Sequence, residues 1–560
     1  MRLVPSIAAD QADERKSRGA FFTPSKLASF LAEWAVRAPG EVVLEPSCGE
    51  AAILTAVAER GQELGGTPLE LCGFDIHSES LEKARRTLAD VGAHAELHVK
   101  NFFDVPADQR FDAVVGNPPY VRYQSIGEQE RIKAQRVALA QGVRLSNQAN
   151  AWAAFVVHAA AFLKPNGRLA LVLPAALLTV NYAASVRLFL LRRFRKVRLV
   201  MFEERVFPNV TEEVLLLLAE GPRLLESAAP PQFDVFQVHD IAELPAIAGL
   251  PDKSKRTWSP EAATDKWMHA LVDAAATNAY ELVARSPGFT DLSTWGETDL
   301  GAVTGNNLFF TLTRGDVATL ELREDEVTRI SPPGSQHLRG LTFSKKAFEE
   351  MAEEGARVYL FRPDPERLSQ GSLRYIEGGE RRRVHKAYKC EVRKHWFVVP
   401  PVRVPDLFLT YMNHDAPRLV SNGAKVAHLN SVHGVTLNRG LKKLGEELLP
   451  LAMLNSATLL GAELVGRSYG GGILKIEPKE ADHLPLPTRV TLERVAVPLR
   501  VLQQQVGKEL RAGRLDEIVQ LVDRIVLGEA LELSDITIGT LRSARASLVS
   551  RRLARGGRSA

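Results

Sequence analysis

Short apolar runs alternate with helical patterns along the first 220 residues of this 560-residue chain. The pattern predicts strands at 42–44, 71–74, 96–99, 112–115 and 168–173, and helices at 51–63, 80–91, 151–163 and 185–193. Strands that alternate with helices of this length are typical of a doubly wound parallel sheet with helices on both faces. Ligands in such folds bind at the carboxyl ends of the strands. The residues that follow each predicted strand are therefore the candidate site.

The pattern changes after about residue 250, where the polar segment LPDKSKRTWSP contains two prolines and marks a boundary. From there to about residue 490 the chain is irregular and richer in basic and aromatic residues. From Thr491 onward apolar residues recur at three- and four-residue spacing, which predicts helices. We therefore expect an α/β domain over 1–250, a mixed α+β domain over 251–490 and a helical segment over 491–560.

The composition, with 45% hydrophobic and 25% charged residues, is that of an ordinary globular protein. The three cysteines, Cys48, Cys72 and Cys390, show no metal-ligand spacing, so we expect neither a disulfide framework nor a metal site. The N-terminus has no long apolar segment, and no run of about 18 apolar residues occurs. These features predict no signal peptide and no membrane span, and they fit a cytoplasmic protein. The net charge of +4 says little about partners, since local charge matters more.

The first three predicted strands each end in residues suited to a nucleotide-like ligand. The first is followed by the turn 45–50 (EPSCGE), whose glycine allows the backbone to approach a ligand closely. Asp75 ends the second strand, where a carboxylate accepts hydrogen bonds from ribose hydroxyls. Asn101 and Phe102 follow the third, where an amide can bond an adenine edge and a ring can pack on its face. Packing in the protein core is an equally good reading of Phe102.

The fourth predicted strand runs directly into Asn117-Pro118-Pro119-Tyr120. Two prolines fix their own φ angles and hold the preceding residue extended, so this loop is rigid. A rigid loop is useful when a weak nucleophile must be held in line with a methyl donor. An amine conjugated to a purine ring is such a nucleophile. The Asn oxygen and a backbone carbonyl can accept both amine hydrogens, which frees the nitrogen lone pair.

An amine inside a DNA duplex is reachable only if its base is flipped out, which costs roughly a few kcal/mol. Stacking of Tyr120 on the flipped base would return about 1–3 kcal/mol. The alternative for this tetrapeptide is a proline turn with a core tyrosine, which its position at a strand end makes the weaker reading.

In their order along the chain, these segments resemble the motifs of γ-class amino-methyltransferases, in particular the TaqI-like N6-adenine DNA methyltransferases. The matching segments are GAFFTP (19–24), LEPSCGEAAIL (44–54), GFDI (73–76), NFFD (101–104), VVGNPPYVRY (114–123) and Phe207-Pro208-Asn209 before the apolar strand 214–219. The resemblance implies a Rossmann-like methyltransferase sheet followed by a target-recognition domain. It also implies S-adenosylmethionine as cofactor and double-stranded DNA as substrate, in a bacterial or archaeal cytoplasm.

Carried over residue by residue, the resemblance implies two sets of site residues. The catalytic set is Asn117, Pro118, Pro119, Tyr120 and Phe207, of which Phe207 would pack on the second face of the base. The cofactor set is Thr23, Glu45, Ser47, Cys48, Gly49, Asp75, Ile76, Asn101 and Phe102. The family usually has Asp where this chain has Asn101, and Asp104 is the alternative there. A core role is the alternative for Phe207.

Two segments resemble the borders of a target-recognition domain, at 305–310 (GNNLFF) and at 468–478 (SYGGGILKIEP). Between them, residues 381–396 carry seven Lys or Arg against one acid, interleaved with Tyr and Trp. This composition suits contacts to phosphates and base edges, although a solvated basic surface is the alternative. The candidate DNA contacts are Arg381, Arg382, Arg383, Lys386, Lys389, Arg393 and Lys394.

Other readings remain open at this point. The same tetrapeptide occurs in methyltransferases that act on RNA or on a protein glutamine amide, and a degenerate fold that only binds DNA is a non-enzymatic alternative. A large, partly basic C-terminal region favours nucleic acid as the substrate. About 20 residues precede GAFFTP, which disfavours a type I modification subunit or a fused nuclease. We expect the modification enzyme of a restriction-modification system, for which a separate cognate endonuclease is a candidate partner.

Overall fold

The computed structural model describes residues 23–121, 123, 127–204, 206–207, 213–222, 233–244, 255–258, 260, 266–401, 403–469 and 471–555. The chain forms two compact units that divide between Leu271 and Val272. The boundary expected at residue 250 lies in a segment outside the described residues. Residues 255–258 form a strand of the first unit, so this unit continues past the polar segment that suggested the boundary.

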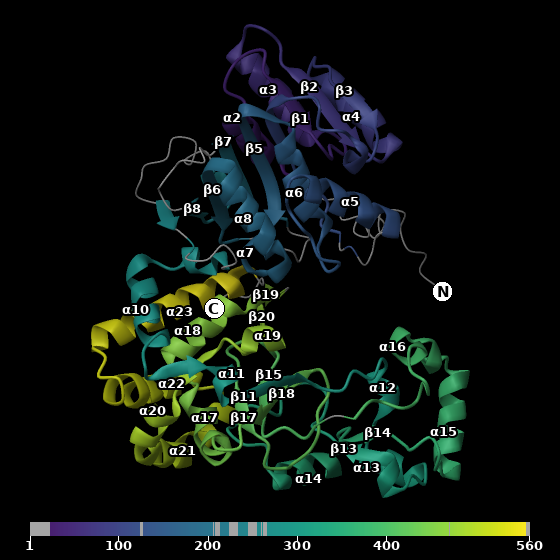
Figure 1. Ribbon diagram of the computed structural model, residues 1–560, viewed down its shortest axis with the longest axis vertical. Helices are drawn as coiled ribbons and strands as arrows, with labels where there is room; N and C mark the ends of the chain where they lie inside the picture. The colour runs from purple at the N-terminus through teal and green to yellow at the C-terminus, as the bar shows by residue number, and fades with distance from the viewer. Residues whose placement is uncertain are drawn as a thin grey trace, which may run out of the picture. The chain divides into compact units, whose positions relative to one another are not determined.

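The first unit is built on one nine-stranded sheet (Figure 1). Its strands lie in the order β3-β2-β1-β4-β5-β7-β6-β8-β9. Their bounds are β1 Val42–Glu45, β2 Glu70–Asp75, β3 Glu96–Val99, β4 Phe111–Gly116, β5 Leu163–Pro174, β6 Phe194–Phe202, β7 Val214–Pro222, β8 Phe233–Val238 and β9 Lys255–Trp258. The chain reverses its winding direction at β1, whose neighbours are β2 and β4. The carboxyl ends of β1, β2 and β4 therefore meet at the crevice where ligands of open α/β sheets bind.

The predicted Rossmann-like α/β fold is confirmed, with one correction to the sheet. The strands from β3 to β5 pair in parallel, as expected. β7 runs antiparallel to both β5 and β6, so the sheet is mixed and not wholly parallel. The apolar pattern of residues 214–219 revealed a buried strand but could not give its direction, because a strand buried on both faces has the same pattern in either direction.

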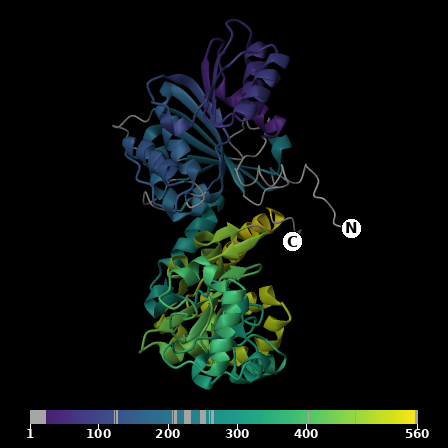
Figure 2. The same cartoon turned by 90° about the vertical axis from the view of Figure 1, so that its right-hand side faces the viewer.

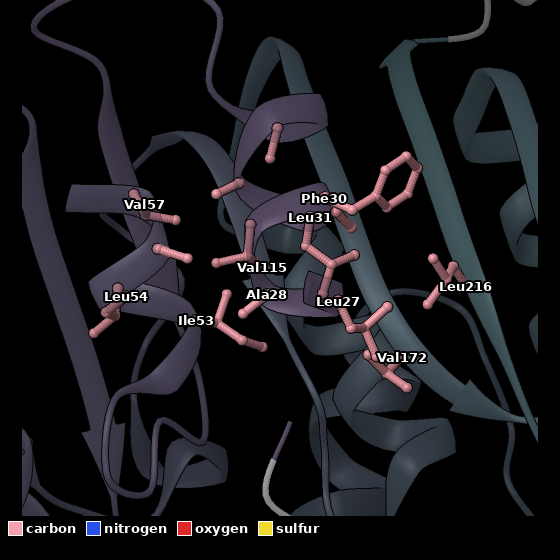
Figure 3. Close-up of a cluster of buried hydrophobic side chains, with 14 of the residues drawn as sticks. Leu27, Ala28, Phe30, Leu31, Ile53, Leu54, Val57, Val115, Val172 and Leu216 are labelled. Atoms are coloured by element: carbon pink, nitrogen blue, oxygen red, sulfur yellow. The ribbon is translucent and has the colours of Figure 1, made fainter. Parts of the chain in front are cut away.

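Helices cover both faces of this sheet (Figures 1 and 2). One face carries α2 Ser25–Ala35, α3 Ala52–Leu64 and α4 Ser78–Asp90, and the other carries α6 Ala151–Ala161 and α8 Ala184–Arg193. Apolar residues of α2 and α3 interlock with alternate residues of the strands, including Val115, Val172 and Leu216 (Figure 3). The helix α5 Glu128–Ala140, which packs against α6, has little apolar periodicity and was not predicted.

The second unit contains small antiparallel sheets surrounded by helices. The largest has the order β11-β18-β15-β17, formed by β11 Gly296–Leu300, β18 Val432–Leu437, β15 Leu407–Thr410 and β17 Leu419–Ser421. Three others are β12-β14-β13 (Thr311–Leu312, Tyr359–Phe361, Val327–Arg329), β16-β20-β19 (Met412–Asn413, Ile473–Lys475, Arg467–Tyr469) and β10-β21 (Phe289–Asp291, Pro485–Pro487). This is the mixed α+β arrangement that the irregular pattern predicted.

The helices of the second unit include the predicted C-terminal ones. Among the described residues, the α-helices are α10 Ala274–Ala284, α11 Leu292–Trp295, α12 Asn307–Phe310, α13 Arg314–Thr319, α14 Lys345–Glu353, α15 Gln370–Arg381, α16 Tyr388–Glu391, α17 Lys442–Ala452, α18 Ser456–Val465, α19 Pro478–Ala481, α20 Arg489–Arg494, α21 Ala496–Arg511, α22 Leu515–Asp523 and α23 Asp535–Arg555. The last helix, α23, packs against α10 and α18, so the helical segment belongs to this unit.

A buried ion pair fastens α23 to the rest of the second unit. The Arg552 side chain, 3% exposed, pairs with Glu463 of α18 at 2.8 Å. It also donates to the backbone oxygens of His414, at 3.1 Å, and Gly472. Gly472 belongs to the segment SYGGG, and its φ of +73° is a conformation that favours glycine. Helix α23 therefore holds the end of the segment that the sequence placed at a domain border.

Candidate functional site

The carboxyl ends of β1 and β2 are joined by a carboxylate with two backbone partners. Asp75, the last residue of β2, accepts a hydrogen bond from the backbone N–H of Gly49 at 2.9 Å and from that of His77 at 2.9 Å. The predicted glycine turn after β1 is further tied to β2 by the bond from Cys48 N–H to Phe74 O, at 2.9 Å. Asp75 thus shapes the turn, and Ile76, 61% exposed, lies beside it on the surface.

Glycine is favoured at two positions of this region, for different physical reasons. Gly49 has a φ of +51° and open space around it, so only its backbone conformation favours glycine. Gly73 has no room for a side chain. A Cβ there would lie 2.8 Å from Leu97 Cδ2 and 3.0 Å from both Cys48 Sγ and Leu54 Cδ1. Gly73 therefore allows the turn after β1 to pack tightly on β2.

Glu45, the last residue of β1, is a buried carboxyl group with 3% of its surface exposed. Burial raises the pKa of Glu45 well above its ordinary value, and the charge of Asp75 acts in the same direction. A hydrogen bond of 3.2 Å from the backbone N–H of Leu54 opposes this rise in the pKa. A cationic group bound nearby would stabilise the ionised form, which makes Glu45 suited to a positively charged ligand.

At the end of the third strand, Asn101 lies where it was predicted, but the Phe102 ring does not lie on the surface of the site. Asn101 lies at the strand end as expected, where its Oδ1 caps the turn by accepting from Phe103 N–H at 2.9 Å. Phe102 is only 2% exposed and stacks on Phe155, with ring centroids 5.6 Å apart. His158 of α6 holds the same turn, because its Nε2 lies 3.2 Å from the Phe102 carbonyl oxygen. Of the two readings of Phe102, the packing is that of a core residue, which leaves its ring little surface for a cofactor.

A contact that the sequence did not indicate lies beside Asn101. The Asn101 side-chain amide donates to Glu130, and Lys133 bonds Asp104 at 2.7 Å and Glu130 at 3.1 Å. Glu130 and Lys133 belong to α5, the helix that showed no apolar periodicity. Their spacing by three residues along an acidic and basic segment is the only signal in the sequence, and it is common on solvated helices.

The tetrapeptide Asn117-Pro118-Pro119-Tyr120, which follows β4, contacts residues from several other parts of the first unit. The Tyr120 hydroxyl donates to Asn117 Oδ1 at 2.9 Å and lies 3.2 Å from Val172 O in β5. The Asn117 amide nitrogen lies 3.4 Å from Thr23 Oγ1, and Ser47 Oγ lies 3.5 Å from the Asn117 carbonyl oxygen. The predicted residues Thr23, Ser47, Asn117 and Tyr120 therefore meet at one place, and Tyr120 packs partly on the core.

The two prolines and Phe207 complete the predicted catalytic set. Pro118 is buried and Pro119 is half-buried. Phe207 is 6% exposed and belongs to the core cluster beneath α2 and α3, which is the alternative given for it above. Residues 19–22, 122 and 208–209 of the matching motifs lie outside the described residues.

The basic segment of the second unit is divided between surface and interior. Six of its cations are exposed, namely Arg381, Arg382, Arg383, Lys386, Lys389 and Lys394. Arg393 is half-buried, and it donates to Val303 O at 2.6 Å and to Trp396 O at 3.3 Å. Its guanidinium also lies 5.5 Å from the centre of the Phe310 ring. Arg393 is thus used to hold the surrounding segments together. Arg382, although exposed, also has contacts within the unit, because its Nε donates to Gly378 O at 3.1 Å and its guanidinium lies 5.4 Å from the centre of the Phe309 ring.

The described parts of the chain contain neither a metal-ligand cluster nor a single membrane-spanning helix. Among those residues, no group of three or more His, Cys, Asp or Glu side chains is placed to hold a metal ion. No single described helix has the length and apolarity of a membrane span. The pair α17 and α18 reaches those values only jointly, across a bend of 87°.

Comparison with known proteins relates this chain to restriction-modification methylases. The family model described as "Eco57I restriction-modification methylase" matches residues 69–207. The model described as "Type II methyltransferase M.Eco57I, C-terminal domain" matches residues 264–527. The two matches follow one another and extend over both units. The chain is a restriction-modification methyltransferase, similar to Eco57I-type enzymes in both units. This confirms the resemblance to restriction-modification methyltransferases that the motifs indicated.

Two relatives match this methylase along most of their length. Type II methyltransferase M.AccI of Acinetobacter calcoaceticus is 21% identical over 532 residues, which cover 92% of this chain and 94% of the relative. Type II methyltransferase M.XamI of Xanthomonas campestris pv. amaranthicola is 23% identical over 480 residues, which cover 84% of this chain and 85% of the relative.

A solved structure shows the same fold across both units. The type IIL restriction-modification enzyme MmeI, solved in complex with DNA, aligns with a TM-score of 0.56 at 11% sequence identity. The alignment covers 98% of the methylase and 77% of MmeI.

Proposed function

We propose that this methylase modifies duplex DNA by transferring a methyl group from S-adenosylmethionine to the exocyclic N6 of a flipped-out adenine. The observation that carries the proposal is the meeting of Asn117 and Tyr120 with Thr23 and Ser47 at the carboxyl ends of the strands. The matches to the two family models and the type II relatives support DNA as the substrate, in the modification half of a restriction-modification system.

The side chains at the strand ends fit the proposed cofactor. Asp75 has carboxylate oxygens at the end of β2, where ribose hydroxyls are bound in related sheets. The buried Glu45 suits the ammonium group of the methionine part, and the exposed Ile76 offers an apolar contact for the adenine ring. S-adenosylmethionine supplies an electrophilic methyl group when it is bound. We leave Phe102 out of this set because it is packed in the core.

Asn117 and Tyr120 have separate roles in the proposed reaction. The Asn117 side-chain oxygen accepts from the Tyr120 hydroxyl. In the proposed reaction it also accepts an amine hydrogen of the target base, since an amide oxygen can accept more than one hydrogen bond. Acceptance of the amine hydrogens localises the nitrogen lone pair for attack. The Tyr120 ring provides a face for stacking the flipped base. The proton released on methylation leaves to solvent.

The test is methyl transfer from labelled S-adenosylmethionine to duplex DNA, to RNA and to no nucleic acid. Digestion of the DNA and mass spectrometry of its nucleosides then identify the methylated base. We expect N6-methyladenine in duplex DNA, abolished by Asn117→Ala. The matched control is Asn166→Ala, which removes an exposed asparagine near the amino end of β5, away from the strand-end site. N4-methylcytosine would keep the amine chemistry but refute adenine, and label only in RNA or protein would refute DNA.

A further inference from the structure

The short helix α16 carries an exposed apolar pair on the surface of the second unit. The side chains of Tyr388 and Val392 are 72% and 63% exposed. They are four residues apart, and the Val392 N–H bonds the Tyr388 carbonyl oxygen at 3.3 Å, so both lie on one face of the helical turn. We call these two residues the 388/392 pair. Neighbouring exposed apolar side chains are more typical of a contact surface than a single exposed one.

The helix α16 is fixed by contacts on its buried side. Cys390 is fully buried, and its Sγ lies 3.8 Å from the Thr304 carbonyl oxygen. A Cβ on Gly305 would lie 3.0 Å from the Lys389 Cβ, so the chain at 304–305 runs directly against α16. Arg393 adds the bond to Val303 O described above. The pair is thus presented by a packed support, with little freedom left to fold back on its own surface.

Exposed cations lie on the same segment as the 388/392 pair. Lys386, Lys389 and Lys394 are exposed on the same segment, and the Lys389 ammonium lies 5.6 Å from the centre of the Tyr388 ring. Between residues 381 and 394 the chain has seven Lys or Arg and a single acid, Glu391. The centre of a protein–protein interface is usually depleted of charge. An exposed apolar pair on a segment rich in cations instead matches a polyanion such as duplex DNA, whose bases and sugars offer apolar faces between the phosphates.

A further exposed apolar residue lies on the neighbouring segment. Leu308 of α12 is 78% exposed and follows Gly305, which packs against α16, by three residues. Figure 1 shows α12 beside α16 at one end of this unit. Leu308 is therefore an exposed apolar residue on a segment that lies beside α16 (Figure 1).

We propose that Tyr388 and Val392 form an apolar wedge that contacts base and sugar faces in a groove of duplex DNA, while the lysines and arginines of the same segment bind its phosphates. Apolar side chains inserted between base steps are a known means by which proteins grip and bend DNA. This inference rests on the proposed function for its substrate. The wedge would add a part of the DNA affinity that does not depend on salt.

The experiment measures binding of the full-length methylase to a labelled duplex that contains a site the wild-type protein methylates, over a range of salt concentrations. Tyr388→Ala and Val392→Ala test the wedge, and Lys386→Ala and Lys389→Ala test the phosphate contacts. Val490→Ala is the matched apolar control, since Val490 is 74% exposed on α20 of the same unit. Tyr388→Phe keeps the ring and removes only the hydroxyl.

We expect Tyr388→Ala to weaken DNA binding by about fivefold or more at every salt concentration, with an unchanged salt slope. Tyr388→Phe and Val490→Ala should bind like the wild type. Each lysine variant should instead lower the slope of log K against log salt by about 0.9 per lost phosphate contact. Equal affinities of Tyr388→Ala and Val490→Ala would overturn the wedge, even if the lysine variants behave as expected. A wild-type protein that methylates no duplex would overturn the proposed function itself, and the wedge with it.

Discussion

Replacement of Glu45 by Gln tests whether the buried carboxyl at the end of β1 is kept for a positively charged ligand. Gln keeps an oxygen that can accept the Leu54 N–H, now 3.2 Å from the carboxylate, and it cannot ionise. The change therefore removes the charge and leaves the shape of the site nearly the same. It isolates the effect of one ionisation.

The magnitude follows from the raised pKa of Glu45, whose first cause is burial. The ordinary value is 4.5, so in the window above it the folded protein keeps a proton that the unfolded chain has lost. The free energy of unfolding contributed by Glu45 is fully present below the unfolded pKa and is lost as pH rises toward the folded pKa. One proton gives a slope of at most about 1.4 kcal/mol per pH unit. Glu45→Gln removes this slope.

The assay is urea unfolding of both proteins, without ligand, from about pH 5 to about pH 8. We expect the stability of the wild type to fall relative to Glu45→Gln as pH rises. In the same window, affinity for S-adenosylmethionine should rise with pH in the wild type, because the bound cation favours the ionised carboxylate. It should stay flat and weaker in the variant. Parallel stability curves for the two proteins would refute the reasoning, since Glu45 would then titrate alike in the folded and unfolded states.

Three further expectations concern packing and catalysis. Gly73→Ala should lower the free energy of unfolding of the first unit by about 1–3 kcal/mol through overpacking, measured by urea unfolding. Gly49→Ala should lower it by only about 1–2 kcal/mol through backbone strain. If both variants lost cofactor affinity equally while neither was destabilised, this account would be contradicted. Arg552→Met should cost about 3–5 kcal/mol because it leaves Glu463 buried and unpaired, and Arg552→Met with Glu463→Met should restore part of that loss; a double variant no better than the single one would contradict the ion-pair account. Tyr120→Phe should slow single-turnover methylation by about two- to tenfold, and Tyr120→Ala by much more, since only the second removes the stacking face; equal rates for the two variants would argue against stacking.

Much of the fold and site could be predicted from the sequence because its signals are local. Strand and helix periodicity depends on neighbours along the chain. It located β1 and β2 with their following helices, and β4, to within a few residues, but it missed α5 after β4. The strand-end rule then indicated Asp75 and Asn117, which lie there with Thr23 and Ser47 close to Asn117. The tetrapeptide NPPY is rigid by its own composition, so its loop geometry needs little from the rest of the chain.

Tertiary structure decided which of two chemically suitable roles each ambiguous side chain has. Phe102 could face a ligand or the core, and the rings and the histidine of α6 enclose it in the core. Arg393 has the same composition around it as its exposed neighbours, yet its guanidinium is used by Val303 and Trp396. The sequence by itself determined the strand ends, the rigid loop and the charge of the basic segment. Burial depends on residues distant in the chain that pack against a side chain, and no pattern of near neighbours contains that information.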